Sequence, residues 1–421
     1  MGAVTGPATG GCCNTKENEP ENCAAARVAK AFAPELSARR REDLARPAAA
    51  DLFRVIASGM VAWFHIWQQS WVGAGAVDHW PRTGAVWVDV LILLSAFCLF
   101  LPYAGAVAEH RQLPQLTPAQ FYRKRAVRIL PSYYVCLAAS LAMVLYRRGW
   151  SKELAVDLAS HLTLTQMFFP AGYTRAQLNG VTWTLTIFAL FYAVFPWLAK
   201  AMARRPVQTL TALLAVQLGY SLWAVPQYGT AAYGFLFNQF PAFCGVFAVG
   251  FAGALAFAWL GRCPAVWSRS ARVCFTLLGL AALWGVDRLL RMQNTQAYQL
   301  VQLTNRMPLA LAVCAAMVCL ALGVAIPLRR VWRFLAGISY NFYLWHQMLA
   351  VWFKYYFHIP AWAGDTPPNQ LGDAAWMHRY NLLCWALALG SAVLFTYGIE
   401  KPAARLLTRR TGENKGVKGS V

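Results

Sequence analysis

The stretch DLFRVIASGMVAWFH, from Asp51 to His65, decides the fold because it combines an apolar run with charged side chains. The apolar run continues through Ile66 and Trp67, so the segment is apolar enough to enter a bilayer. It nevertheless contains an aspartate, an arginine and a histidine, and a charged side chain in mid-membrane costs about 2.5 kcal/mol or more. A helix that keeps such residues must gain something from them.

The rest of the chain has the composition of a membrane protein. Of its 421 residues, 58% are hydrophobic and 13% are charged, whereas soluble domains have about 25% charged residues. A helix of about 17 to 25 mostly apolar residues can span a bilayer. We therefore expect an all-α polytopic integral membrane protein with about ten transmembrane helices, over residues 51–72, 85–104, 129–146, 181–199, 207–225, 237–259, 273–290, 308–326, 335–356 and 380–398.

The net charge of +21 follows from the orientation of these helices. Cytoplasmic flanks of membrane helices are enriched in Lys and Arg. With the N-terminus inside, the flanks on that side hold more than twice as many Lys and Arg residues as the opposite flanks, so both termini are expected in the cytoplasm. A charge of this origin does not indicate a nucleic acid partner. The expected domains are a disordered cytoplasmic tail (1–50), a membrane domain (51–405) and a basic cytoplasmic tail (406–421).

A polar stripe runs along the first predicted helix. Arg54 and His65 are eleven residues apart, which places them within about 20° of one another around the axis and about 16 Å apart along it. Asp51 and Ser58 fall near the same stripe. Such a stripe must face the interior of the helix bundle or a water-filled cavity.

A simpler interpretation of the charged residues is open. Asp51 and Arg54, at i and i+3, can form a pair at the cytoplasmic interface, and His65 can be a hydrogen-bonded core residue. His65, however, lies about 21 Å past the start of the helix, within a hydrocarbon core about 30 Å thick. A side chain at that depth cannot reach the cytoplasmic surface, which favours a functional stripe.

A second basic cluster occurs in FYRKRAVRILPSYY, residues 121–134. Arg125 and Arg128 are at i and i+3, so both side chains project from one face at the predicted cytoplasmic boundary. Membrane anchoring alone explains Arg123 and Lys124. Two guanidinium groups on one face, with Arg54 on the same membrane side, suit phosphate groups better than anchoring requires.

These residues and several further segments resemble the membrane-bound acyltransferase 3 family. Asp51 and Arg54 match its D-x-x-R opening, and Arg54 with His65 matches an R-x10-H spacing. Arg125 and Arg128, followed by ILPSYY, match an R-x-x-R element. Five further segments resemble the family in the expected order: WVDVLILLSAF (87–97), TLTQMFFP (163–170), NGVTWTL (179–185), GISYNFYLWH (337–346) and IEKP (399–402).

The sequence departs from the family pattern at two positions. Phe188 occupies the place of a glutamate in the fourth helix, where the family usually has W-S-L-x-x-E-x-x-F-Y. Ala96 replaces the glycine of the S-G-F element. The first departure puts an acidic role of that helix in doubt and is compatible with a changed acceptor.

The resemblance implies an enzyme of the cell membrane that transfers an acyl group, acetyl in the simplest case, from cytoplasmic acyl-CoA to a carbohydrate hydroxyl. It has no bound cofactor or metal, and its oligomeric state is open. Arg54, Arg125 and Arg128 would hold the donor, and His65, with Arg54, would act in catalysis. The residues expected to support them are Asp51, Ser58, Asp89, Tyr133, Trp183, Tyr343, His346 and Glu400, of which Asp89 is the best candidate for the partner of an arginine.

His346 is the alternative base. It lies in mid-helix, one turn from Tyr343, which it could hydrogen-bond, and its simpler role is a packed contact. The remaining histidines are expected to be solvated: His79, His110, His161, His358 and His378. A transporter and a non-catalytic membrane scaffold are the alternative functions, although the two halves of the sequence show no repeat. A metal site on Cys12, Cys13 and Cys23 is a weak alternative.

The predicted topology can be tested by cysteine labelling in intact cells. We expect a single cysteine placed in residues 1–40 to react with an impermeant reagent only after lysis. A cysteine in the 358–378 loop should react before lysis and serves as the control. Labelling of the N-terminal cysteine in unbroken cells would contradict the topology.

Overall fold

A computed structural model describes residues 38–409 of the chain, with side chains over 42–407. By its contacts the chain divides after Arg41, and the fold presented here is that of the unit beginning at Glu42. The expectations for residues 1–37, including the weak cysteine site, and for residues 410–421 lie outside the described residues.

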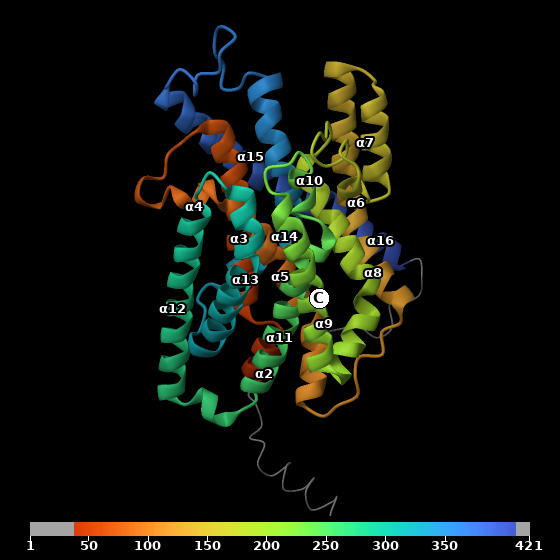
Figure 1. The fold of residues 1–421 in the computed structure, drawn as a ribbon, viewed down its shortest axis with the longest axis vertical. Coiled ribbons are helices and arrows are strands. Elements are labelled where there is room, and N and C mark those ends of the chain that lie inside the picture. Colours follow the sequence, from red (N-terminus) through yellow and green to blue (C-terminus); the bar gives the residue numbers. More distant parts are fainter. Residues whose placement is uncertain (1–37, 410–421) are drawn as a thin grey trace, which may run out of the picture. The chain divides into compact units, whose positions relative to one another are not determined.

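The described part of the chain is helical and contains no strand, which confirms the predicted all-α class (Figure 1). Its longer α-helices are α2 Ala38–Ala45, α3 Ala48–Ser70, α5 Trp87–Ala108, α6 Pro118–Arg148, α7 Lys152–Leu162, α8 Trp183–Arg204, α9 Pro206–Ala224, α11 Cys244–Leu260, α12 Arg269–Gln293, α13 Tyr298–Gly323, α14 Arg329–Val351, α15 Ala374–Phe395 and α16 Lys401–Arg409. Short α-helices are α4 His79–Arg82 and α10 Tyr233–Leu236. Single turns of 3₁₀-helix are η1 Gly75–Val77, η2 Gly84–Val86, η3 Gln166–Phe168, η4 Gly180–Thr182, η5 Val225–Gln227, η6 Phe240–Phe243 and η7 Pro264–Trp267, and two π-helical turns are η8 Trp352–Tyr356 and η9 Thr396–Glu400.

Nine helices among the described residues are long and apolar enough to cross a membrane. The predicted segment 335–356 is also helical, as α14 and η8, but it is not among the nine. Its polar residues, which include Asn341, His346 and Gln347, lower its hydropathy.

Helix α3 begins earlier than predicted. It starts at Ala48 instead of Asp51 and follows Pro47, whose extended backbone precedes the first turn. Three alanines in a row fill that turn, and alanine has the highest helix propensity. Asp51 therefore lies within the first turn, where a carboxylate interacts favourably with the helix dipole.

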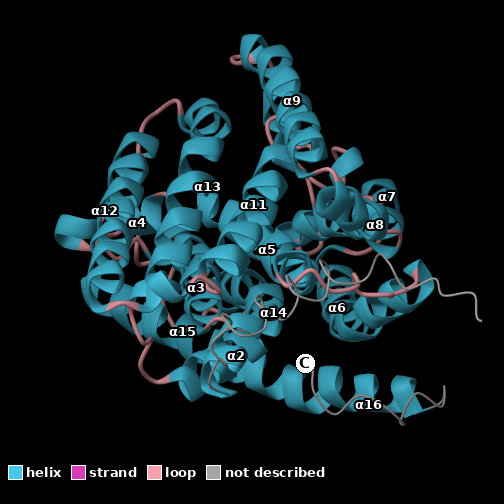
Figure 2. Ribbon diagram, turned by 90° about the horizontal axis from the view of Figure 1, so that it is seen from below, coloured by secondary structure: helices cyan, strands magenta, loops and turns pink. Residues whose placement is uncertain are grey.

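Helix α3 lies among α5, α13, α14 and α15, as both ribbon views show (Figures 1 and 2). The turn η2 also packs against it very closely. A Cβ atom on Gly84 would lie 2.2 Å from the carbonyl oxygen of Met60, so only glycine permits this approach. The polar stripe of α3 is consequently enclosed by protein over part of its length, as a charged membrane helix requires.

Helix α6, which bears the second basic cluster, has a well-defined start. The Thr117 hydroxyl accepts from the backbone N–H of Gln120, and the Gln120 side chain accepts from the backbone N–H of Thr117. This reciprocal capping box, with Pro118 in the first turn, fixes where the helix begins. It thereby sets the rotation at which Arg125 and Arg128 leave the helix.

Arg306 stands just before the predicted membrane helix 308–326, so from the sequence it is expected to be one of the charges that flank the helices. The structure places it inside α13 with no exposed surface. Its Nε donates to Oδ2 of Asp89 at 3.0 Å, its Nη2 donates to Oδ1 of Asn238 at 2.7 Å, and its guanidinium lies 4.0 Å from the centre of the Phe243 ring. Asp89 of α5 therefore has an arginine as its partner, on a helix far along the chain.

We expect Arg306→Met to lower the free energy of unfolding by about 3–5 kcal/mol, because Asp89 would become an unpaired buried carboxylate. Unfolding of the purified protein in mixed detergent micelles measures the loss. Arg288→Met is the control, since Arg288 is exposed on α12. Equal effects of the two substitutions would mean that the buried pair does not stabilise the fold.

Candidate functional site

Three arginines from two helices form a basic cluster. The guanidinium of Arg128 on α6 is close enough to interact electrostatically with Arg54 on α3 and Arg125 on α6, and also with Glu400. None of the three arginines forms an ion pair with a side chain in the described range 42–407. Arg54 donates only a weak hydrogen bond, at 3.4 Å, to the sulfur of Cys98 on α5. The cluster is thus a site with excess positive charge.

Glu400 is held beside this cluster by α14. The amide of Asn341 donates to Oε2 of Glu400 at 2.9 Å and to the hydroxyl of Thr396 at 2.9 Å. These bonds join the π-helical turn η9 to α14 at a point where Asn341 is fully buried. Glu400 is therefore a fixed carboxylate near Arg128 and does not form a direct ion pair with it.

The pair between Asp51 and Arg54, which the simpler interpretation of the charged residues assumed, is not formed. Asp51 accepts two hydrogen bonds from Arg46, each 3.1 Å long, and Arg46 precedes the start of α3. The hydroxyl of Ser58 donates to the Arg54 carbonyl oxygen of its own helix at 2.9 Å. Both supporting residues of the stripe thus have partners, whereas Arg54 and His65 remain as its groups without an ionic partner.

The two rival histidines lie against each other. The ring centres of His65 on α3 and His346 on α14 are 5.3 Å apart. Nδ1 of His65 is 3.1 Å from Oε1 of Gln68 and also 3.1 Å from Nε2 of Gln347. From the sequence, His65 and His346 were rival candidates for the base. In the structure they are neighbours, because α3 and α14 pack together.

The hydrogen bond predicted between His346 and Tyr343 takes a different form. Nδ1 of His346 lies 2.8 Å from the backbone carbonyl oxygen of Tyr343, so it is the main chain that accepts. The Tyr343 hydroxyl donates to the carbonyl oxygen of Val181 at 2.9 Å and accepts from Thr184 at 3.1 Å. Tyr343 thereby joins α14 to the segment NGVTWTL (179–185).

Three other predicted supporting residues contact different parts of the fold. The Trp183 ring packs on Tyr173 and Phe243, and Phe243 underlies the Arg306–Asp89 pair. The hydroxyl of Tyr133 donates to the backbone carbonyl oxygen of His161 at 2.8 Å. Asp89, Trp183 and Tyr133 therefore have contacts of a structural kind.

The expectation that His79 and His161 are solvated is wrong. Nδ1 of His161 lies 2.8 Å from the carboxylate of Asp157, and both residues are fully buried. Nε2 of His79 lies 2.7 Å from Asp287 of α12. The i,i+4 spacing of Asp157 and His161 could have revealed the first pair, whereas the second joins distant segments and has no local sequence pattern.

No sequence pattern indicated that Gln347 would contact His65 or that Cys98 would contact Arg54. Gln347 follows His346 directly, but its contact with His65 depends on how α14 packs on α3. Cys98 lies in an apolar stretch of α5 without any distinguishing spacing. Contacts between helices position both residues.

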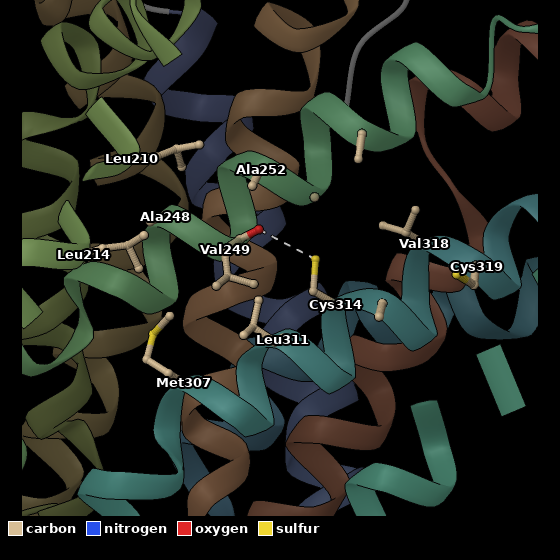
Figure 3. Close-up of a pocket in the computed structure, with 13 residues that line it drawn as sticks. Leu210, Leu214, Ala248, Val249, Ala252, Met307, Leu311, Cys314, Val318 and Cys319 are labelled. Atoms are coloured by element: carbon tan, nitrogen blue, oxygen red, sulfur yellow. Dashed lines mark hydrogen bonds between the residues drawn. The ribbon is translucent and has the colours of Figure 1, made fainter. Parts of the chain in front are cut away.

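Two apolar hollows lie between membrane helices. One, of about 440 Å³, is lined by α6 and α8, and both Arg125 and Phe188 face it. The other, of about 430 Å³, lies between α9, α11 and α13, where the Cys314 thiol donates to the Val249 carbonyl oxygen at 3.6 Å (Figure 3). Its walls contain no acid, base or arginine, so it offers no groups for acyl transfer, whereas the first hollow adjoins the basic cluster.

Comparisons with known proteins agree with this arrangement. A family model for an acyltransferase domain matches residues 48–401. Nodulation protein 10 of Rhizobium leguminosarum bv. viciae is 24% identical over 169 residues, which are 37% of this chain and 44% of that protein. Exopolysaccharide production protein ExoZ of Rhizobium meliloti (strain 1021) is 30% identical over 129 residues, 29% of this chain and 36% of that protein.

The matched part is less than half the length of either of these relatives. No solved structure gives a significant match to the chain. The family match, in contrast, extends from the first residue of α3 to the first residue of α16 and includes the arginine cluster and both histidines of the site. The chain belongs to the acyltransferase 3 family.

Proposed function

We propose that the protein is a membrane O-acyltransferase that moves an acyl group, acetyl in the simplest case, from cytoplasmic acyl-CoA to a hydroxyl of a surface or secreted carbohydrate. The observation that supports this most directly is the convergence of Arg125 and Arg128 with Arg54, on the same helix as His65. A polyanionic donor and a proton acceptor would thus meet along one side of α3. The name of the exopolysaccharide production protein supports a polysaccharide-type acceptor.

The basic cluster suits the phosphates of a nucleotide-containing donor. Guanidinium groups bind phosphate with two parallel hydrogen bonds, and three of them here have no ionic partner among the described side chains. Phe188 is also compatible with a phosphate site at this cluster. It faces the hollow that Arg125 also lines, and a glutamate there could pair with that arginine. With phenylalanine at this position, Arg125 stays available for an anionic ligand.

The reaction needs one base. The acceptor hydroxyl oxygen attacks the thioester carbonyl carbon while His65 accepts the hydroxyl proton. The C–O bond forms, the C–S bond breaks, and its electron pair leaves on sulfur, which then receives the proton as free CoA thiol. Imidazole suits this exchange because it both accepts and releases protons near neutral pH. His65 and Arg54 are about 16 Å apart along α3, so the donor would lie along the helix.

We expect the double substitution Arg125→Gln and Arg128→Gln to weaken acyl-CoA binding at least tenfold, because two bidentate phosphate partners are lost. Lysine replacements should restore binding only in part, since a point charge lacks the planar fork. Binding of labelled acetyl-CoA to the purified protein measures the effect.

The matched control is Arg123→Gln with Lys124→Gln, which removes the same charge from the same helix. If both double variants weaken binding equally, the cluster acts only through net charge. Unchanged binding by the Arg125/Arg128 variant would overturn the assignment of the donor site.

We expect His65→Ala to lower the transfer rate by about 10²–10⁴-fold, the usual effect of losing a general base. Donor affinity and expression should stay near those of the unchanged protein. Transfer of labelled acetyl groups to isolated surface glycans measures the rate, and His378→Ala, at an exposed position, is the control. Half of the original rate in the His65 variant would exclude it as the base, and rapid-quench labelling without acceptor distinguishes direct transfer from an acyl-histidine intermediate.

A further inference from the structure

We propose that His346 is a positioning residue for His65, and that the two imidazoles share the proton taken from the acceptor hydroxyl. The inference rests on the proposed function, because it concerns the base of that reaction. It assigns a role to a nitrogen atom, Nε2 of His346, that has no partner among the described residues although it is buried.

The tautomer of His346 is fixed by its own helix. Nδ1 lies 2.8 Å from the Tyr343 carbonyl oxygen and 3.2 Å from the Phe342 carbonyl oxygen. Carbonyl oxygens can only accept, so the hydrogen of the neutral ring must be on Nδ1. Nε2 then has a free lone pair in surroundings from which solvent is almost excluded, since His346 is 1% exposed.

His65, in contrast, needs hydrogen-bond acceptors once it is protonated. When it takes up a proton it becomes an imidazolium with two N–H donors. Oε1 of Gln68, 3.1 Å from Nδ1, accepts one of them. The second N–H requires another acceptor, because an unpaired charged donor inside a membrane protein is costly.

His346 is placed to be that acceptor. The ring centres are 5.3 Å apart, and the rings are not hydrogen-bonded to each other in the structure, so the N–H···N bond would form when His65 is protonated. No carboxylate among the described side chains contacts either ring, so the pair contains no group resembling the aspartate of a catalytic triad. A neutral imidazole with its lone pair on Nε2 would stabilise the His65 cation as the hydroxyl proton arrives.

Gln347 supports the same exchange. Its Nε2 donates and Gln68 Oε1 accepts, and both lie 3.1 Å from Nδ1 of His65. Nδ1 can satisfy only one of them at a time. With Nδ1 protonated and bonded to Gln68, His65 has its lone pair on Nε2 and can act as a base, whereas the bond from Gln347 stabilises the tautomer with Nε2–H.

The test uses two substitutions that separate packing from proton sharing. In His346→Asn the side-chain amide can still donate to the Tyr343 carbonyl oxygen, but the acceptor at Nε2 is gone. We expect kcat to fall at least 30-fold while the KM for the donor and the unfolding temperature stay near their original values. His161→Asn is the control for the spectra, because His161 is also buried, with Nδ1 near its own helix's Asp157 carbonyl oxygen and Nε2 without a partner among the described residues. It also removes the partner of the Asp157 carboxylate, so its unfolding temperature is expected to fall and is not compared.

Two readouts distinguish sharing from a structural role. Combining His346→Asn with His65→Gln should cost no more than the worse single substitution, because residues that act as a unit are not additive. In ¹⁵N-histidine spectra, His346 should show a protonated Nδ1 and a bare Nε2. The His65 Nε2 resonance should shift in His346→Asn but not in His161→Asn.

The proposal is overturned if His346→Asn keeps a kcat within threefold of the unchanged protein, or if the two substitutions multiply. An unprotonated Nδ1 on His346, or His65 resonances that do not depend on residue 346, would overturn it as well. The spectra need no acyl transfer. If the unchanged protein transfers no acyl group, the proposed function fails, while the spectra still decide whether the two histidines share a proton.

Discussion

The cost of placing charged groups in a bilayer is the constraint on which this structure depends. Helix α3 brings an aspartate, an arginine and a histidine into a membrane-spanning segment, and each must find protein or water around it. The fold meets this requirement by placing α3 among α5, α13, α14 and α15. Helices α9 and α12, in contrast, have only 17% of their apolar windows buried inside the protein, against 56% for the window that includes α3.

The charges inside the bundle fall into two classes. Asp51 pairs with Arg46, five residues earlier in the chain, whereas the buried pair of Asp89 with Arg306 joins α5 to α13. A buried pair destabilises strongly when one partner is lost, so Asp89 and Arg306 maintain the architecture. The arginine cluster, in contrast, has no ionic partner among the described side chains. An unpaired positive charge inside a membrane protein costs free energy, and an anionic ligand would supply the missing partner.

The same reasoning applies to the histidines. His161 has a carboxylate beside it and fixes the α7 region through Asp157, which also accepts backbone hydrogen bonds from residues 177 and 178. Among the described residues, the hydrogen-bond partners of His65 and His346 are side-chain amides and main-chain carbonyls. A neutral imidazole without a carboxylate beside it has a lone pair on one ring nitrogen that can accept a proton. His161 thus differs from His65 and His346 in these partners.

Local periodicity and composition were enough to predict the helical class and nearly all of the membrane helices, because these depend on residues close together in the chain. The proximity of Arg125 and Arg128 on α6 follows in the same way from their i,i+3 spacing. The partners could not be predicted. Arg306 meets Asp89 across 217 residues of chain, and Gln347 meets His65 across 282. Such contacts depend on which helices pack together and on how each helix is rotated about its axis. Side-chain packing across the whole bundle determines both, so no single segment of the sequence encodes them.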